Sequence, residues 1–192
     1  MNLLVLGPQG AGKGTQAQRI AVDYAIPHIS TGELFRDAIA EGSELGEQVE
    51  PILASGRLVP DEITVELIRE RLERADARAG FVLDGFPRNL AQAEALDAML
   101  VEIGRRLDAV LFFDLPDELA TERMLRRAET EGRADDKPAV IARRLATYHE
   151  LTQPVVEHYR TIGSFAPLHA ERTIPEVYAE VQEALAELEG EA

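Results

Sequence analysis

The chain has 192 residues, of which 45% are apolar and 29% charged, as is usual for a soluble globular domain. It contains no cysteine, which excludes disulfide bonds, thiolate catalysis and a cysteine-ligated zinc site. The formal net charge of −15 argues against a nucleic acid or an anionic membrane as a partner, because both attract positively charged surfaces.

The first residues lack the basic region that opens a signal peptide. No apolar run approaches the ~20 residues that a membrane-spanning helix needs. We therefore expect a cytoplasmic protein. Positive charge is carried almost wholly by arginine, since Lys13 and Lys137 are the only lysines. This bias reflects either genome composition or a use for the planar guanidinium beside phosphate groups, and the sequence leaves both explanations open.

Short apolar runs alternate with segments of helical periodicity along the chain. The apolar runs predict five strands, at residues 3–6, 27–30, 81–83, 109–115 and 164–169. The periodic segments predict helices at residues 13–24, 33–40, 46–54, 63–74, 90–103, 117–129, 140–159 and 175–188. Continuous apolar strands that alternate with amphipathic helices indicate an α/β fold, with a five-stranded parallel sheet covered by helices on both faces.

Two segments depart from simple alternation of strands and helices. Two extra helical pieces separate the second and third strands, which is too much chain for a simple crossover. We therefore expect residues 30–59 to form an inserted subdomain. The polar segment before residue 136 contains Gly132 and is expected to be an exposed loop that joins two helices. Both segments would belong to one domain that spans residues 1–192.

The strongest motif is the run GPQGAGKGT at residues 7–15, directly after a predicted strand and before a predicted helix. Its glycines let the backbone wrap tightly, so that N–H groups and the helix N-terminus converge on a phosphate chain. Lys13 would add positive charge near the β- and γ-phosphates. A glycine-rich turn without a ligand explains the lysine and both flanking elements less well. The expected contact residues are Gly10, Ala11, Gly12, Lys13, Gly14 and Thr15.

Four further runs follow this loop in a fixed order. They are STGELFR at residues 30–36, GRLVP at 56–60, DGFPR at 84–88 and EGRADD at 131–136, the last before a helix that carries Arg144. Together with the loop, they closely resemble the adenylate kinase family in its short-lid form, over essentially the whole chain. The resemblance implies a P-loop kinase fold with residues 30–59 as the NMP-binding subdomain and residues 126–136 as a short, zinc-free lid.

By the same resemblance, the protein would transfer the terminal phosphoryl group of MgATP to AMP and give two ADP. Arg36 and Arg88 would clamp the acceptor phosphate, while Thr31 and Gln92 would favour adenine. Related pyrimidine monophosphate kinases usually carry alanine where Thr31 stands, so a UMP/CMP kinase with the same mechanism is the alternative. The implied AMP-binding residues are Thr31, Arg36, Arg57, Leu58, Val59, Gly85, Phe86, Pro87, Arg88, Gln92, Arg133 and Arg144.

On the donor side, the resemblance implies that ATP contacts Arg123, Arg127 and Arg172 besides the glycine-rich loop. The family often has glycine near Arg172, so GTP stays open as a donor. Asp84 ends a buried strand and would hold Mg²⁺ through water, with helix capping as the alternative role. The residues implied in catalysis are Lys13, Arg88, Arg123, Arg133 and Arg144.

The sequence shows no motif for a general base. An acceptor phosphate is already ionised at neutral pH, so alignment and charge neutralisation would suffice. We expect the histidines to lack partners, and Arg126 and Arg143 to be solvated helix residues or members of i,i+4 ion pairs. The histidines are His28, His149, His158 and His169.

A P-loop GTPase or nucleotide sensor is the competing class. It needs a guanine-reading Asn-Lys-x-Asp motif, and neither Asn2 nor Asn89 precedes a lysine. Because both clefts need freedom to close and no exposed apolar stripe stands out, we expect a monomer with small-molecule substrates.

Overall fold

The computed structural model describes residues 1–131, 136–161 and 164–190. These residues form a parallel sheet in the order β2-β3-β1-β4-β5. The strands are β1 (Asn2–Leu6), β2 (His28–Ser30), β3 (Phe81–Asp84), β4 (Ala109–Asp114) and β5 (Phe165–His169). The predicted α/β class with a five-stranded parallel sheet is confirmed, and each strand lies within one residue of its predicted ends.

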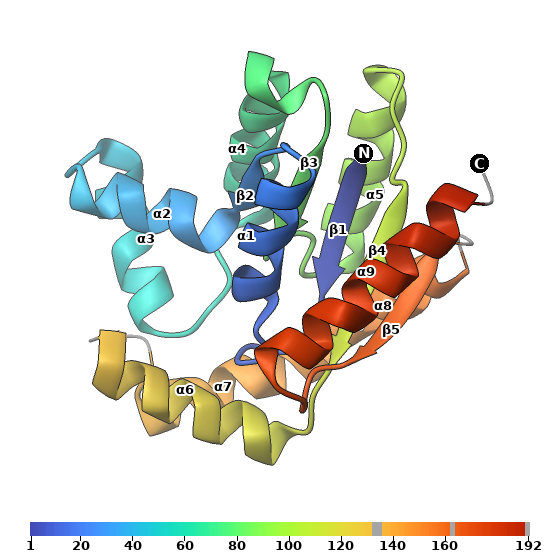
Figure 1. The fold of residues 1–192 in the computed structure, drawn as a ribbon. Helices are drawn as coiled ribbons and strands as arrows, with labels where there is room; N and C mark the ends of the chain where they lie inside the picture. Colours follow the sequence, from blue (N-terminus) through green and yellow to red (C-terminus); the bar gives the residue numbers. More distant parts are fainter. Residues whose placement is uncertain (132–135, 162–163, 191–192) are drawn as a thin grey trace.

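Helices connect the strands and lie on both faces of the sheet (Figure 1). They are α1 (Lys13–Asp23), α2 (Thr31–Ala40), α3 (Glu44–Ala54), α4 (Asp61–Glu73), α5 (Leu90–Glu102), α6 (Asp117–Glu131), α7 (Pro138–Thr147), α8 (Gln153–Arg160) and α9 (Ile174–Gly190). A short 3-10 turn, η1, covers Ala75–Ala77. None of the described helices is long and apolar enough to cross a membrane.

The prediction of one continuous helix at residues 140–159 is wrong. The structure divides it into α7 and α8, with a π-helical turn at Tyr148–Thr152 between them. Pro154 stands in the first turn of α8. Because proline has no N–H to donate and its ring crowds the carbonyl four residues earlier, regular α-helical bonding cannot run through this point.

The central strand explains why both faces of the sheet must be covered. Successive side chains of β1 point to opposite faces. Leu3 and Val5 join a core with α1 and α9, while Leu4 and Leu6 join a second core with α4, α5 and α8. All four side chains are buried. A strand that is apolar at every position therefore needs helices on both sides, which Figure 1 shows.

A third, smaller core lies under α2 and α3 and contains Phe35, Val49 and Val59. Gly46 lets the two helices approach closely, since a Cβ there would lie 2.2 Å from the carbonyl oxygen of Ala38. Figure 1 shows α2 and α3 as an arm beside the sheet, with α6 and α7 across the carboxyl ends of the strands. The domain boundaries at residues 30–59 and 126–136 stay predictions.

Candidate active site

A cavity of about 900 Å³ lies at the carboxyl edge of the sheet. Its walls come from the loop after β1, the start of α2, the segment after β3, helices α6 and α7, and the loop after β5. The predicted site residues that line it are Gly10, Ala11, Gly12, Lys13, Gly14, Thr15, Arg36, Asp84, Gly85, Pro87, Arg88, Arg123, Arg127, Arg144 and Arg172. Residues from distant parts of the chain thus meet at one site.

The loop after β1 is built to receive a negatively charged group. Gly12 has a positive φ of 81° and is the N-cap of α1, and no side chain caps the helix. The helix therefore presents N–H groups and the positive end of its dipole to the cavity. The ammonium group of Lys13 folds over this loop and donates hydrogen bonds of 2.8 Å to the carbonyl oxygens of both Gly7 and Pro8.

The pKa of Lys13 reflects its burial and the charged groups around it. Burial, together with the positive charges of Arg88, Arg144 and Arg127, lowers the pKa of Lys13 to about 8 against the opposing effect of Asp84. Each of these groups also lines the cavity. The described lining of the cavity holds Lys13 and seven arginines against three acids, Glu33, Asp84 and Glu171, and this excess of positive charge favours a polyanionic ligand.

Asp84 lies at the end of β3 and faces the first turn of α1. A Cβ added to Gly14 would lie 3.5 Å from its Oδ2 atom. Burial alone would raise the pKa of Asp84, but the neighbouring His28, Lys13 and Arg88 outweigh it and hold the pKa below its usual value. Because Asn89 caps α5, the helix-capping role for Asp84 is wrong.

The residues present fit a magnesium ion that is held mainly by phosphates. An ionised Asp84 and the hydroxyl of Thr15 line the same cavity. Among the described residues there is no group of three or more His, Cys, Asp or Glu side chains that could hold a metal. Mg²⁺ commonly binds through one or two carboxylates plus substrate phosphates, with waters completing its octahedral shell.

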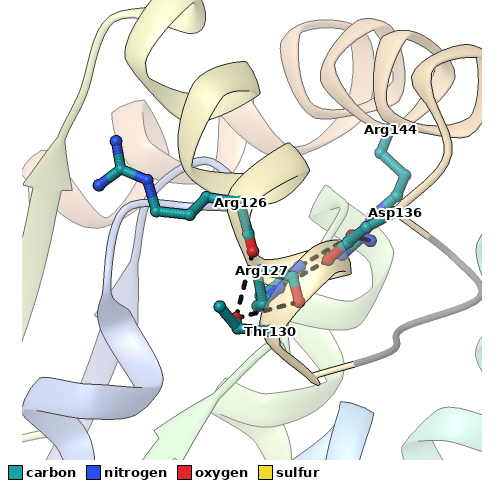
Figure 2. A network of polar contacts seen from close by, with 5 residues as sticks. All are labelled: Arg126, Arg127, Thr130, Asp136 and Arg144. Carbon is teal, nitrogen blue, oxygen red and sulfur yellow. Dashed lines mark hydrogen bonds and ion pairs between the residues drawn. The ribbon is translucent and has the colours of Figure 1, made fainter.

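Asp136 joins Arg127 of α6 to Arg144 of α7, two of the predicted arginines (Figure 2). Its carboxylate accepts hydrogen bonds from Nε and Nη2 of Arg127, at 2.7 and 2.9 Å, and from Nη1 of Arg144, at 2.8 Å. The Asp136 side chain is 0% exposed. Sequence reasoning did not single out this residue, although its place beside the arginine-rich segment was a usable signal.

The other predicted arginines have varied partners. Arg123 on α6 donates to the carbonyl oxygens of Ala170 and Glu171, at 2.8 and 3.2 Å, and so ties α6 to the loop after β5. Arg172 forms an ion pair with Glu180 of α9. Arg133 lies outside the described residues.

Comparison with known proteins shows the family to which the chain belongs. A family model described as adenylate kinase matches residues 5–164. An adenylate kinase from a Cyanothece species is 47% identical over 98% of this chain and 97% of its own length. An adenylate kinase from Stenotrophomonas maltophilia is 44% identical over 96% of this chain and 99% of its own length. The chain belongs to the adenylate kinase family. It is therefore a nucleoside monophosphate kinase, a phosphotransferase of the P-loop class.

In this adenylate kinase family member, the start of α2 and the segment after β3 meet at Gly85. Its carbonyl oxygen accepts hydrogen bonds from Oγ1 of Thr31, at 2.9 Å, and from Nε of Arg88, at 2.7 Å. The Phe86–Pro87 peptide bond is cis. Several predicted AMP-binding residues do not line the cavity in this structure; they are Thr31, Arg57, Leu58, Val59, Phe86 and Gln92.

The Gln92 side chain is buried, unlike most glutamines, which lie on the surface. Its Oε1 accepts the backbone N–H of Arg88 at 2.8 Å, and its Nε2 donates to Asp61 at 2.7 Å. Asp61 also accepts from the side chain of Asn89. Each bond of Gln92 uses one of the two N–H donors or one of the two oxygen lone pairs of its amide, so a contact with a base does not require either bond to break. Asp61 was missed because it lies 31 residues earlier, at the start of α4.

The expectation that the histidines lack partners is wrong. Each lies near a carboxylate: His28 Nε2 is 3.5 Å from Asp84, His149 is 2.8 Å from Asp117, His158 is 2.9 Å from Asp97 and His169 is 3.2 Å from Glu180. These partners are 11 to 61 residues distant along the chain. No short motif could reveal them. His28 is the one that contacts a predicted site residue.

The two arginines expected to be plain surface residues behave differently. Arg126 forms the expected i,i+4 ion pair with Glu122, at 2.7 Å, but it also lines the cavity. Figure 2 shows its side chain extending away from Asp136. Arg143 donates from Nη1 to the backbone carbonyl oxygen of Ser55, 2.9 Å away. Arg143 is exposed, as predicted for a solvated helix residue, but it also contacts the turn after α3, because tertiary packing brings that turn against α7.

Proposed function

We propose that this protein transfers the terminal phosphoryl group of MgATP reversibly to AMP, giving two ADP. One observation carries the proposal. A strongly acidic chain collects Lys13 and arginines from α2, α6, α7 and the segment after β3 around one cavity. Like charges repel, so such a cluster is stable only with anionic partners. Two phosphate chains that meet end to end would supply them.

In this proposal the loop at residues 7–15 holds the ATP phosphates, and Arg123, Arg127 and Arg172 complete the donor side. The Lys13 ammonium, already above the loop, would move from the carbonyl oxygens of Gly7 and Pro8 to the β- and γ-phosphates. Asp84 would hold Mg²⁺ through water. When bound, the metal supplies positive charge that neutralises the phosphates and aligns them.

On the acceptor side, Arg36 and Arg88 would clamp the α-phosphate of AMP. Both line the cavity. Thr31, Gln92 and the backbone of residues 57–59 would recognise adenine. Because the attacking phosphate oxygen is already ionised, the protein would supply alignment and charge stabilisation but no base.

The lid at residues 126–136 would close over both nucleotides. Closure would bring in the arginines of α6 and α7 and exclude water, which otherwise competes as an acceptor. A zinc-free lid, a monomeric state, a cytoplasmic location and the lack of a nucleic-acid or membrane partner belong to the same proposal.

A coupled assay with ATP and AMP, GMP, CMP or UMP offered separately tests the acceptor. AMP should give the highest kcat/KM. A higher value with UMP or CMP would establish the pyrimidine alternative and refute the role of Thr31 and Gln92.

The role of Arg88 is tested by Arg88→Ala. We expect nearly unchanged ATP affinity with kcat lowered about 10³-fold, as for arginines that stabilise a phosphoryl transition state. Arg78→Ala is the matched control, because Arg78 is exposed and lies outside the cavity lining. An equal loss of ATP affinity in Arg88→Ala would make Arg88 a structural residue.

A further inference from the structure

The turn after α3 rests on one face of α7. Nη1 of Arg143 donates to the carbonyl oxygen of Ser55 at 2.9 Å, and the two residues lie 88 positions apart. On the same face of α7, Val140 and Arg144 lie against Gly56. Positions 140, 143 and 144 are related by i,i+3 and i,i+4 spacing, so they form one continuous patch. We call this contact the α7 seat.

Gly56 shows how closely the two surfaces fit. Its φ is +74°, and a Cβ there would lie 2.8 Å from Cγ1 of Val140 and 3.3 Å from Cγ of Arg144. Real Cβ atoms essentially never lie as close as 2.8 Å to another heavy atom of this kind. The turn is also fixed internally, because Ser55 Oγ donates to the carbonyl oxygen of Ile52 at 2.7 Å. A rigid turn with no side chain at its contact point can therefore approach α7 at backbone distance.

The α7 seat connects the segment assigned to the AMP base with a helix of the cavity wall. Arg144 follows Arg143 directly, lines the cavity and is held by Asp136. Residues 57–59 follow Gly56 directly and are the segment assigned to the AMP base. One contact thus joins the acceptor segment to the helix that carries a phosphate-binding arginine. A change of a few ångströms at the seat would move one of these groups relative to the other.

We propose that Arg143 is a positioning residue for AMP, acting through the α7 seat and not through contact with the substrate. The inference rests on the proposed phosphorylation of AMP. With the guanidinium bound to Ser55, the acceptor segment stays in register with Arg144. Without it, the segment moves away from α7, and AMP loses alignment while the ATP site keeps its own contacts.

The first test is Arg143→Ala. We expect KM for AMP to rise about tenfold, which corresponds to about 1.4 kcal/mol, and KM for ATP to change less than twofold. Arg143→Lys keeps a donor that can reach a carbonyl oxygen and should recover most of the AMP affinity. Arg78→Ala, on an exposed site, should leave both values unchanged. Equal rises in both KM values, or no rise for AMP, would overturn the proposal.

A second test uses the glycine. Gly56→Ala should also raise KM for AMP, because its Cβ forces the turn off Val140. Val140→Ala removes the Cγ1 atom nearest to that Cβ, so the double variant should recover part of the loss. Failure of the double variant to recover any AMP affinity would mean that the close fit against α7 has no role.

Calorimetric titration with AMP separates the two proposals. A wild-type protein that binds AMP but makes no ADP from ATP and AMP would refute the proposed function. In that case, weaker AMP binding by Arg143→Ala would still support the α7 seat. Equal AMP affinity in the wild-type protein and Arg143→Ala would refute the seat whatever the catalytic result.

Discussion

Asp136 offers the sharpest test of how the arginines are held. Asp136→Asn keeps the size of the side chain but removes its charge and places an amide donor where an oxygen now accepts. Three hydrogen bonds from Arg127 and Arg144 end on this carboxylate, at 2.7, 2.9 and 2.8 Å. At least one arginine N–H group would then face the new donor.

The size of the effect follows from burial. Removal of one partner from a buried ion pair costs about 3–5 kcal/mol. Here the arginine side chains are 24% and 14% exposed, so water recovers part of that cost. We expect a loss of about 2–3 kcal/mol in the free energy of unfolding, hence a Tm lower by about 5–10 °C for a chain of this size. Misplaced arginines should also lower kcat on the order of 10²-fold.

Thermal unfolding followed by circular dichroism, together with ADP formation, measures both effects. Glu122→Gln is the matched control, since it makes the same carboxylate-to-amide change in the exposed pair with Arg126. Exposed pairs contribute about 0–1 kcal/mol, so this control should melt close to the wild-type protein. If Asp136→Asn melts within about 2 °C of the wild-type protein and keeps full turnover, the buried carboxylate does not position the arginines.

Two further predictions concern the loop at residues 7–15. Between the folded pKa of Lys13, about 8, and its ordinary value of 10.5, the unfolded chain binds more protons. The free energy of unfolding without nucleotide should therefore rise with pH across this window, by at most about 3 kcal/mol because Lys13 is only partly shielded from solvent. Urea unfolding at several pH values should show this rise in the wild-type protein and its loss in Lys13→Met. An equal rise in both proteins would contradict the prediction. Gly10→Ala should destabilise the protein more than Gly12→Ala. Both glycines have positive φ, but only a Cβ at Gly10 would meet a neighbour, the carbonyl oxygen of Ala120 at 2.7 Å. Equal Tm values for the two variants would exclude the clash as the cause.

Much of the fold was predictable because it depends on local patterns. The apolar run of β1 required cover on both faces, and helical periodicity located most helix ends within two residues. The division of the helix at residues 140–159 was missed because the apolar spacing continues through it. Periodicity reports which face is buried and is insensitive to one missing backbone donor at Pro154.

The site was predictable where the motif itself supplies the chemistry. Lys13 and the glycines of its loop follow from spacing, and the family resemblance selected the arginines. The partners of these groups were not predictable, because they are long-range pairs. Asp61 meets Gln92 only when α4 packs against α5, and Ser55 meets Arg143 only when the turn after α3 reaches α7. A sequence pattern indicates on which face of a helix or strand a side chain lies, but it does not indicate which residues pack against that face.

The charge arrangement suggests why those missed partners matter. Two carboxylates, on Asp84 and Asp136, lie among the cations of the cavity, yet the pKa of Lys13 is still lowered to about 8. Burial is the main cause of this shift and the arginine charges add to it against Asp84, so the protein keeps a net electrostatic cost for a protonated Lys13 at the site. A phosphate chain would remove that cost by favouring the protonated form of Lys13. Part of the driving force for nucleotide binding is thus stored in the folded protein, as unneutralised charge beside a helix N-terminus that no side chain caps.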